Sequence, residues 1–172
     1  MKFPNQIVVN QFGTLTLDVV RPDVLMVPTL KSLTTTPPAA LPNPTVDHFQ
    51  CYRVKRSKGT LRFTKVRGVK VDDQFGTALV DLLKPQTLCA PASKNGENPT
   101  APSHPFHLLC YKTRASGFGT TQTFTNNQFG PGFPLLIHRR ELCVPSLKNP
   151  PVTTTTTTTT TSTSTTTMMP LT

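Results

Sequence analysis

The chain has few acidic residues and no recognisable enzyme motif. Only 8 of its 172 residues are Asp or Glu, against 18 Lys and Arg, which gives a net charge of +10. So few carboxylates leave little for general acid–base catalysis. The Gly-x-Ser-x-Gly elbow, the phosphate-binding loop and the His-Glu-x-x-His zinc motif do not occur in the sequence. We therefore expect a protein that is not an enzyme and binds no cofactor.

Long apolar runs and N-glycosylation sites are also absent from the sequence. No window reaches the roughly 18 apolar residues that cross a bilayer as a helix, and no apolar export signal follows Met1-Lys2-Phe3-Pro4. Both Asn-x-Thr triplets, at 43–45 and 98–100, carry the proline that blocks glycosylation. The cysteine pattern described below nevertheless favours a secreted or cell-surface location. We therefore expect this sequence to be a fragment of a longer precursor.

Stretches free of proline and glycine are short, and this argues against long helices. The chain has 18 prolines, and only 35% of its residues are hydrophobic. Prolines at this density favour short strands and turns, and the low apolar content disfavours one large core. The composition therefore predicts an all-β protein made of small units that need cross-links.

A repeated pattern is the clearest feature that the sequence does contain. Gln-Phe-Gly occurs at 11–13, 74–76 and 128–130, and fifteen residues after each Gln comes Met26, Cys89 or Cys143. A second motif, His-x-x-Cys-Tyr, occurs at 48–52 and 107–111. One complete repeat therefore runs from His-x-x-Cys-Tyr to the Cys that follows Gln-Phe-Gly.

The motifs divide the chain into repeats and linkers. We expect a partial repeat, its C-terminal half, at 1–32, complete repeats at 47–96 and 105–149, and linkers at 33–46 and 97–104. The Thr-rich tail at 150–172 is predicted to be disordered, either as a flexible spacer or as an O-glycosylated stalk. Each complete repeat is expected to form a small β-barrel or sandwich of four to five short strands.

The motifs in combination resemble a family of bacterial secreted tandem-repeat domains of unknown function. The resemblance covers about residues 5–32 and 47–149. It implies the repeat boundaries and export, and it supplies no activity. Met26 departs from it, because the family pattern has a cysteine at that position.

The four cysteines allow three pairings, of which we predict Cys51–Cys89 and Cys110–Cys143. Both pairs lie within equivalent repeats and span similar lengths of chain. The partial repeat has lost its first cysteine and carries Met26 in place of the second, as pairing within each repeat requires. Metal binding by His48 with Cys51, or His107 with Cys110, is disfavoured because each repeat lacks a fourth recurring ligand.

The Gln-Phe-Gly motifs are predicted to be the tips of β-hairpins. Alternating apolar residues flank the first two motifs, while Pro131, Gly132 and Pro134 should make the third hairpin the least regular. Phe12, Phe75 and Phe129 are unusual at such tips. Each ring either folds back as a plug or projects, and three projecting rings would form a multivalent binding edge.

The densest run of positive charge lies between 53 and 70 and contains no acidic residue. Its basic residues are Arg53, Lys55, Arg56, Lys58, Arg62, Lys65, Arg67 and Lys70. If the interleaved apolar residues turn inward, these side chains form a face that attracts an anionic glycan or another polyanion, or simply a solvated basic surface. We expect surface adhesion or weak polyanion binding, with a purely structural spacer as the alternative. Nucleic-acid binding has only charge in its favour, because no recognised module is present.

Overall fold

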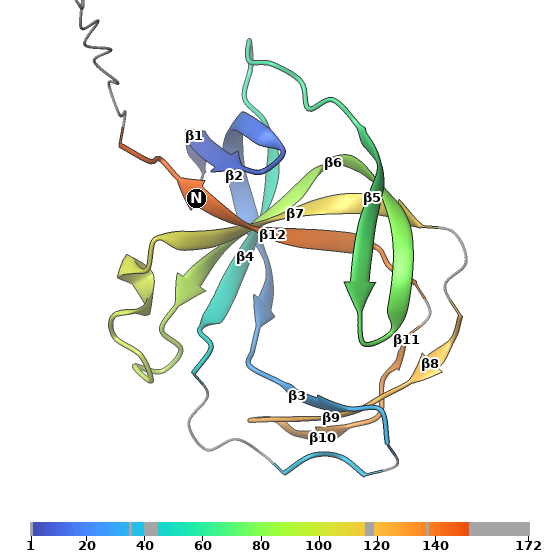
Figure 1. The fold of residues 1–172 in the computed structure, drawn as a ribbon. Helices are drawn as coiled ribbons and strands as arrows, with labels where there is room; N and C mark the ends of the chain where they lie inside the picture. The colour runs from blue at the N-terminus through green and yellow to red at the C-terminus, as the bar shows by residue number, and fades with distance from the viewer. Residues whose placement is uncertain (1, 35, 40–44, 116–118, 137, 152–172) are drawn as a thin grey trace, which may run out of the picture.

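The computed structural model describes residues 2–34, 36–39, 45–115, 119–136 and 138–151, and most of them lie in antiparallel strands (Figure 1). The elements are β1 (Phe3–Asn10), β2 (Gly13–Met26), β3 (Leu30–Ser32), β4 (His48–Arg56), β5 (Val66–Asp73), β6 (Gly76–Ala92), the 3-10 helix η1 (Ala101–Ser103), β7 (Phe106–Ala115), β8 (Thr121–Gln122), β9 (Phe124–Asn127), β10 (Gly130–Gly132), β11 (Leu135–Leu136) and β12 (Glu141–Lys148). The prediction of an all-β fold is confirmed. The predicted tail from 152 onward lies outside the described residues, as do 35 and 40–44 of the first linker.

Seven strands form one sheet in the order β4-β2-β1-β12-β7-β6-β5. Because β4 pairs with β6 as well as with β2, the strands from β4 round to β6 close into a ring. Strands from all three predicted segments are thus hydrogen-bonded to one another in this sheet, where separate small barrels or sandwiches were expected. A segment of this size buries little surface alone. Pairing across segments gives hydrogen-bond partners to the backbone N–H and C=O groups that the edge strands of each separate segment would leave unpaired.

The three Gln-Phe-Gly motifs form the turns of three hairpins, as predicted. At each tip the Oδ1 atom of the preceding Asx side chain accepts a hydrogen bond from the phenylalanine N–H, at 2.8–2.9 Å. The glycine that ends each turn has a φ angle of 101° to 111°, which a residue with a Cβ rarely adopts. The residues of these tips are Asn10 to Gly13, Asp73 to Gly76 and Asn127 to Gly130.

The first hairpin and its neighbouring strand β4 pair in the same register as the second hairpin and its neighbouring strand β7. Asn5 N–H donates to Asp18 Oδ1 at 3.1 Å, and Gly68 N–H, at the matching position, donates to Asp81 Oδ1 at 3.0 Å. The β2–β4 ladder pairs Val24 with Cys51, and the β6–β7 ladder pairs Thr87 with Cys110. Each ladder has two register shifts, which follow Val19 and Pro22 in β2 and the matching residues Leu82 and Pro85 in β6. Positions matched by the sequence motifs therefore occupy matching places in the two ladders.

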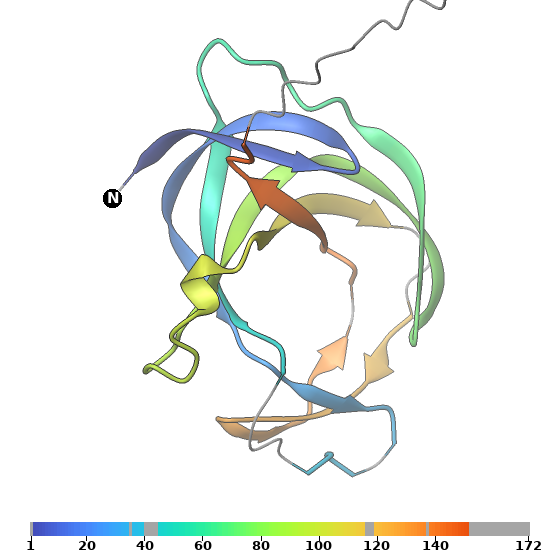
Figure 2. The same cartoon turned by 60° about the vertical axis from the view of Figure 1, so that its left-hand side comes forward.

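The third hairpin is shorter than the other two. Its returning strand is broken into β10 and β11, which pair with β9 and β8 in two small sheets. Pro131 lies within β10 and Pro134 lies between β10 and β11. Proline cannot donate to a ladder, which accounts for the irregular hairpin. Strand β3 pairs with β9, so a strand of the first segment completes this region (Figure 2).

The core of the ring is apolar and contains one fully buried tyrosine. The buried residues are Val8, Leu15, Leu17, Val19, Val80, Leu82, Leu88, Leu109, Tyr111 and Val144. The amide group of Asn10 donates to the hydroxyl group of Tyr111 at 3.0 Å and to that of Ser146 at 3.0 Å. Three strands, β1, β7 and β12, therefore meet at this partly buried polar contact.

Both predicted disulfides, Cys51–Cys89 and Cys110–Cys143, are confirmed. They join β4 to β6 and β7 to β12, and Cys89 Sγ lies 3.9 Å from Cys110 Sγ, so the two bonds pack against each other. Disulfides of this kind are consistent with an extracytoplasmic location. No helix among the described residues is long and apolar enough to span a membrane.

Candidate functional site

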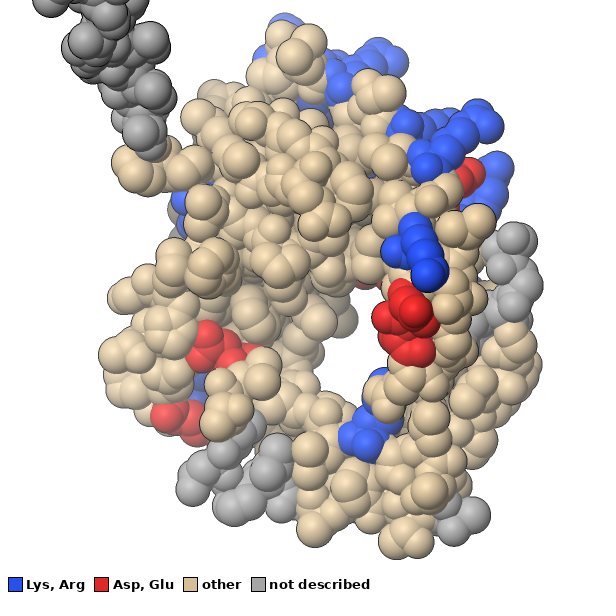
Figure 3. Space-filling view, viewed as in Figure 1, with Lys and Arg blue, Asp and Glu red and all other residues tan. Residues whose placement is uncertain are grey.

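The predicted basic run occupies the end of β4, the loop 57–65 and β5. In Figure 3, Lys and Arg side chains gather over this loop and along β5 at one side of the molecule. Lys58, Lys65, Arg67 and Lys70 are exposed there. Phe63 lies between them in sequence but packs against the core, as do the valines of the run. The basic side chains thus remain at the surface while the apolar ones are drawn inward.

The loop 57–65 begins with a tight turn that is tied to β2. The N–H of Thr60 donates to the carbonyl of Ser57 at 3.3 Å, and Gly59 takes a φ of 80° within this turn. Ser57 is buried, and its N–H donates to the carbonyl of Thr16 at 3.1 Å. Further along, the Phe63 ring packs against the Tyr111 ring with 4.9 Å between centroids. The loop is therefore held at both ends.

A buried hydroxyl group also fixes a carboxylate beside this loop. Ser57 Oγ donates to Asp18 Oδ1 at 2.5 Å, and this hydrogen bond is the main cause that lowers the pKa of Asp18 below 3.8. The second oxygen of Asp18 lies 3.8 Å from Lys55 Nζ, in a partly exposed ion pair. Asp18 is thus ionised at neutral pH and holds the base of the loop against β2.

A pocket of about 450 Å³ opens between this loop, β4 and β6. Its apolar wall includes Leu15, Leu17, Val54, Leu61, Phe63 and Pro85, and its ionisable residues are Lys55, Arg56, Arg62 and Lys84. All four ionisable residues are basic, and none of the described residues that line the pocket is a carboxylate. Cations around an apolar pocket favour an anionic group attached to a less polar body.

The structure brings together only part of the predicted basic set. Lys55, Arg56 and Arg62 line the pocket, whereas Arg53 points elsewhere, with its Nε 2.9 Å from Asp23 Oδ2. Sequence reasoning missed Lys84, which lies on β6, far from the run along the chain. The available signal was its repeat position, which it shares with the basic residue Arg21.

The three hairpin-tip phenylalanines have three different surroundings. The Phe12 ring packs edge-on against the Tyr111 ring at 5.6 Å, as expected for a plug. The Phe75 ring is half-buried and lies 4.0 Å from Lys31 Nζ, a cation–π contact. The Phe129 ring is exposed. Three equivalent projecting rings are therefore not present, and the tips do not form a uniform binding edge.

The recurring histidines lie at the start of β4 and of β7, the two strands that flank β6. His48 and His107 are both buried, and burial lowers the pKa of His107 below 6.5. His48 Nε2 lies 3.7 Å from Glu97 Oε2. Among the described residues one group, Cys110 with Glu141 and Cys143, has the spacing of metal ligands. Both of its cysteines are joined in a disulfide and so offer no thiolate to a metal.

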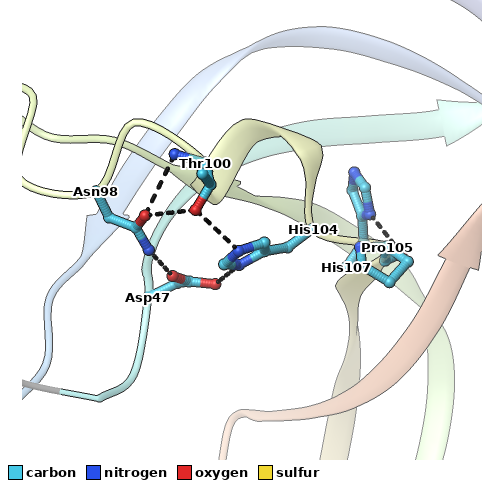
Figure 4. A network of polar contacts seen from close by, with 6 residues as sticks. All are labelled: Asp47, Asn98, Thr100, His104, Pro105 and His107. Atoms are coloured by element: carbon cyan, nitrogen blue, oxygen red, sulfur yellow. Dashed lines mark hydrogen bonds and ion pairs between the residues drawn. The ribbon is translucent and has the colours of Figure 1, made fainter.

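A polar network joins the loop before β7 to the start of β4 (Figure 4). His104 Nδ1 lies 2.5 Å from Asp47 Oδ2, and its Nε2 lies 3.4 Å from the Thr100 hydroxyl oxygen. This order of hydroxyl, imidazole and carboxylate resembles that of hydrolase triads. The Thr100 hydroxyl, however, makes its shorter hydrogen bond to Asn98 Oδ1, at 2.8 Å, and Asn98 in turn donates to Asp47 at 2.9 Å. The four side chains thus satisfy one another and anchor the loop.

Compared with protein-family models, with curated proteins and with solved structures, the chain matches none of them.

Proposed function

We propose that the protein is a non-enzymatic, extracytoplasmic binding module for anionic polymers, and that acidic surface glycans are its ligands. The observation that carries the proposal is the pocket whose ionisable residues, Lys55, Arg56, Arg62 and Lys84, are all basic. A sulfate or carboxylate group would be attracted by the cations, while the apolar face of a sugar ring would lie on the Phe63 side of the pocket.

The exposed cations outside the pocket extend the same surface. Lys58, Lys65, Arg67 and Lys70 lie on the adjoining loop and on β5, so a polymer held in the pocket has further positive charge along its path. Such contacts release counterions and weaken as salt rises. The net charge of +10 adds long-range attraction to any polyanion. A role in surface adhesion, as part of a secreted repeat protein, is consistent with these features.

Titration with a heparin oligosaccharide across salt concentrations tests the proposal. The variant Arg56→Gln, Arg62→Gln, Lys84→Gln removes three pocket cations, and we expect its slope of log K against log salt to be smaller by about 2 to 3. A matched variant, Lys2→Gln, Arg140→Gln, Lys148→Gln, removes three exposed cations elsewhere and should keep most of the affinity.

Two results would count against the proposal. Equal losses in the two triple variants would mean that only net charge matters. No binding by the wild-type protein would favour the alternative, in which the protein is a structural spacer. A single-stranded DNA oligonucleotide, titrated in parallel, should bind more weakly than the glycan if the pocket selects a sugar body.

A further inference from the structure

The C-terminal half of β2 lacks a neighbour that its counterpart in β6 possesses. Residues 17–26 of β2 pair with β4, and only residues up to Val19 pair with β1 on the other edge. In the part of the chain that the structure describes, no strand pairs with this edge between Val20 and Met26. The matching half of β6 is paired on both edges, by β7 and by β4.

The missing neighbour leaves apolar side chains exposed. Val24, Leu25 and Met26 are 52%, 42% and 40% exposed. Their counterparts by motif and by register, Thr87, Leu88 and Cys89, are 2%, 3% and 0% exposed. The difference in exposure comes from β4, which lies along this part of β6 and pairs its Cys51 directly with Cys89. The residue that would pair with Met26 in the same way is not supplied by the described chain.

An opening in the molecule lies beside this edge. In Figures 1 and 2 it separates the end of β2 from β11 and the start of β12, and Figure 3 shows that side chains do not fill it. Strand β12 pairs with β7 on one edge, and on the other, among the residues that the structure describes, only Leu147 and Lys148 pair, with β1. Both borders of the opening thus carry stretches of backbone that no other described strand pairs, and such stretches can hydrogen-bond to an added strand.

We propose that this edge of β2 binds an extended strand of a partner polypeptide, and that the strand has the pattern shared by β4 and β7. That pattern, His-x-x-Cys-Tyr followed by a basic residue, identifies the occupant because β4 covers the equivalent residues of β6. The strand adds main-chain hydrogen bonds to β2, and its side chains cover Val24 and Met26. Because position 26 is Met, the contact is noncovalent, unlike the disulfide that joins β4 to β6. This proposal does not depend on the proposed glycan binding.

A cysteine-trapping experiment tests both the strand and its register. The probe is a synthetic peptide with the sequence of residues 47–57, whose cysteine corresponds to Cys51. In a glutathione redox buffer, Met26→Cys should form a mixed disulfide with the peptide at least about tenfold faster than Leu25→Cys. Leu25 is the matched control because it is as exposed as Met26 but lies on the other face of the strand. Peptide mapping must find both native disulfides intact.

Hydrogen exchange on the wild-type protein provides a second readout without an added thiol. Saturating peptide with Ser in place of its Cys should slow amide exchange at residues 20–26, while a scrambled peptide should not. Equal trapping at positions 25 and 26, or unchanged exchange at 20–26, would overturn the proposal. Slower exchange at β5 alone would place the peptide on another edge, and would overturn it equally.

Discussion

Removal of one disulfide should destabilise the whole described fold and not only the segment that contains it. Cys51 and Cys89 are separated by 38 residues, and closing a loop of this length in the unfolded chain contributes about 4 kcal/mol on the loop-entropy model. Small domains have a total free energy of unfolding of about 5 to 15 kcal/mol. The variant Cys51→Ala, Cys89→Ala should therefore keep only a fraction of the stability of the wild-type protein. Alanine is preferred to serine because both positions are buried.

The two disulfides should act on one cooperative unit. They join neighbouring strand pairs of one sheet, and β6 and β7 pair along eight positions from Val80 to Cys89. We expect one urea transition whose midpoint falls by about 2 M, if the dependence of the free energy on urea is about 2 kcal/mol/M. The variant Cys110→Ala, Cys143→Ala, with a separation of 33 residues, should lose nearly the same amount.

Urea unfolding followed by far-UV circular dichroism and by Tyr fluorescence measures these changes. Two separate transitions in either variant would show that the segments fold independently, contrary to the reasoning. A midpoint shift below about 0.5 M would show that the disulfides do not constrain the unfolded chain as calculated.

Three further changes should have smaller effects. Tyr111→Phe removes a buried hydroxyl group that is hydrogen-bonded to Asn10, and should cost about 1 kcal/mol of unfolding free energy in the same urea assay. Asp47→Asn weakens the contact with His104 and should cost about 1 kcal/mol at neutral pH, with faster hydrogen exchange in 97–104 and little change in β2. Burial lowers the pKa of His107 below 6.5, so unfolding free energy should fall as pH drops from 6.5 through the folded pKa, and His107→Gln should flatten this dependence. An unchanged pH profile in that variant would assign the dependence to other groups.

Features encoded by neighbouring residues were predictable from the sequence. The hairpin tips depend on an Asx side chain, a short turn and a glycine with positive φ, all within four residues. The disulfides were predictable from the spacing of the repeated motifs. Because Met26 stands where the complete repeats have a cysteine, the partial repeat leaves no unpaired cysteine, and the four cysteines can pair within the two complete repeats. The irregular third hairpin followed from Pro131 and Pro134, because proline disrupts a ladder wherever it lies.

Features that depend on pairing between distant strands were not predictable in this way. The pattern of β4 is the same whether it pairs only with β6 or also with β2, so the sequence does not distinguish separate units from one sheet. For the same reason Lys84 was missed at the pocket, and the pairing of Arg53 with Asp23 across β2 and β4 was not foreseen. The alternation of residues along a strand predicts which side chains of the basic run face outward, but it does not predict which residues from distant strands they contact.

Amide chemical-shift mapping during titration with a heparin oligosaccharide tests the central claim, glycan binding at the basic pocket, most directly. Perturbations should concentrate at residues 55–56, 61–63 and 84, which come from β4, the loop 57–65 and β6 and together line the pocket. They should also diminish as salt is raised. Shifts scattered over all exposed Lys and Arg residues, or confined to the edge of β2 at residues 20–26, would contradict the claim.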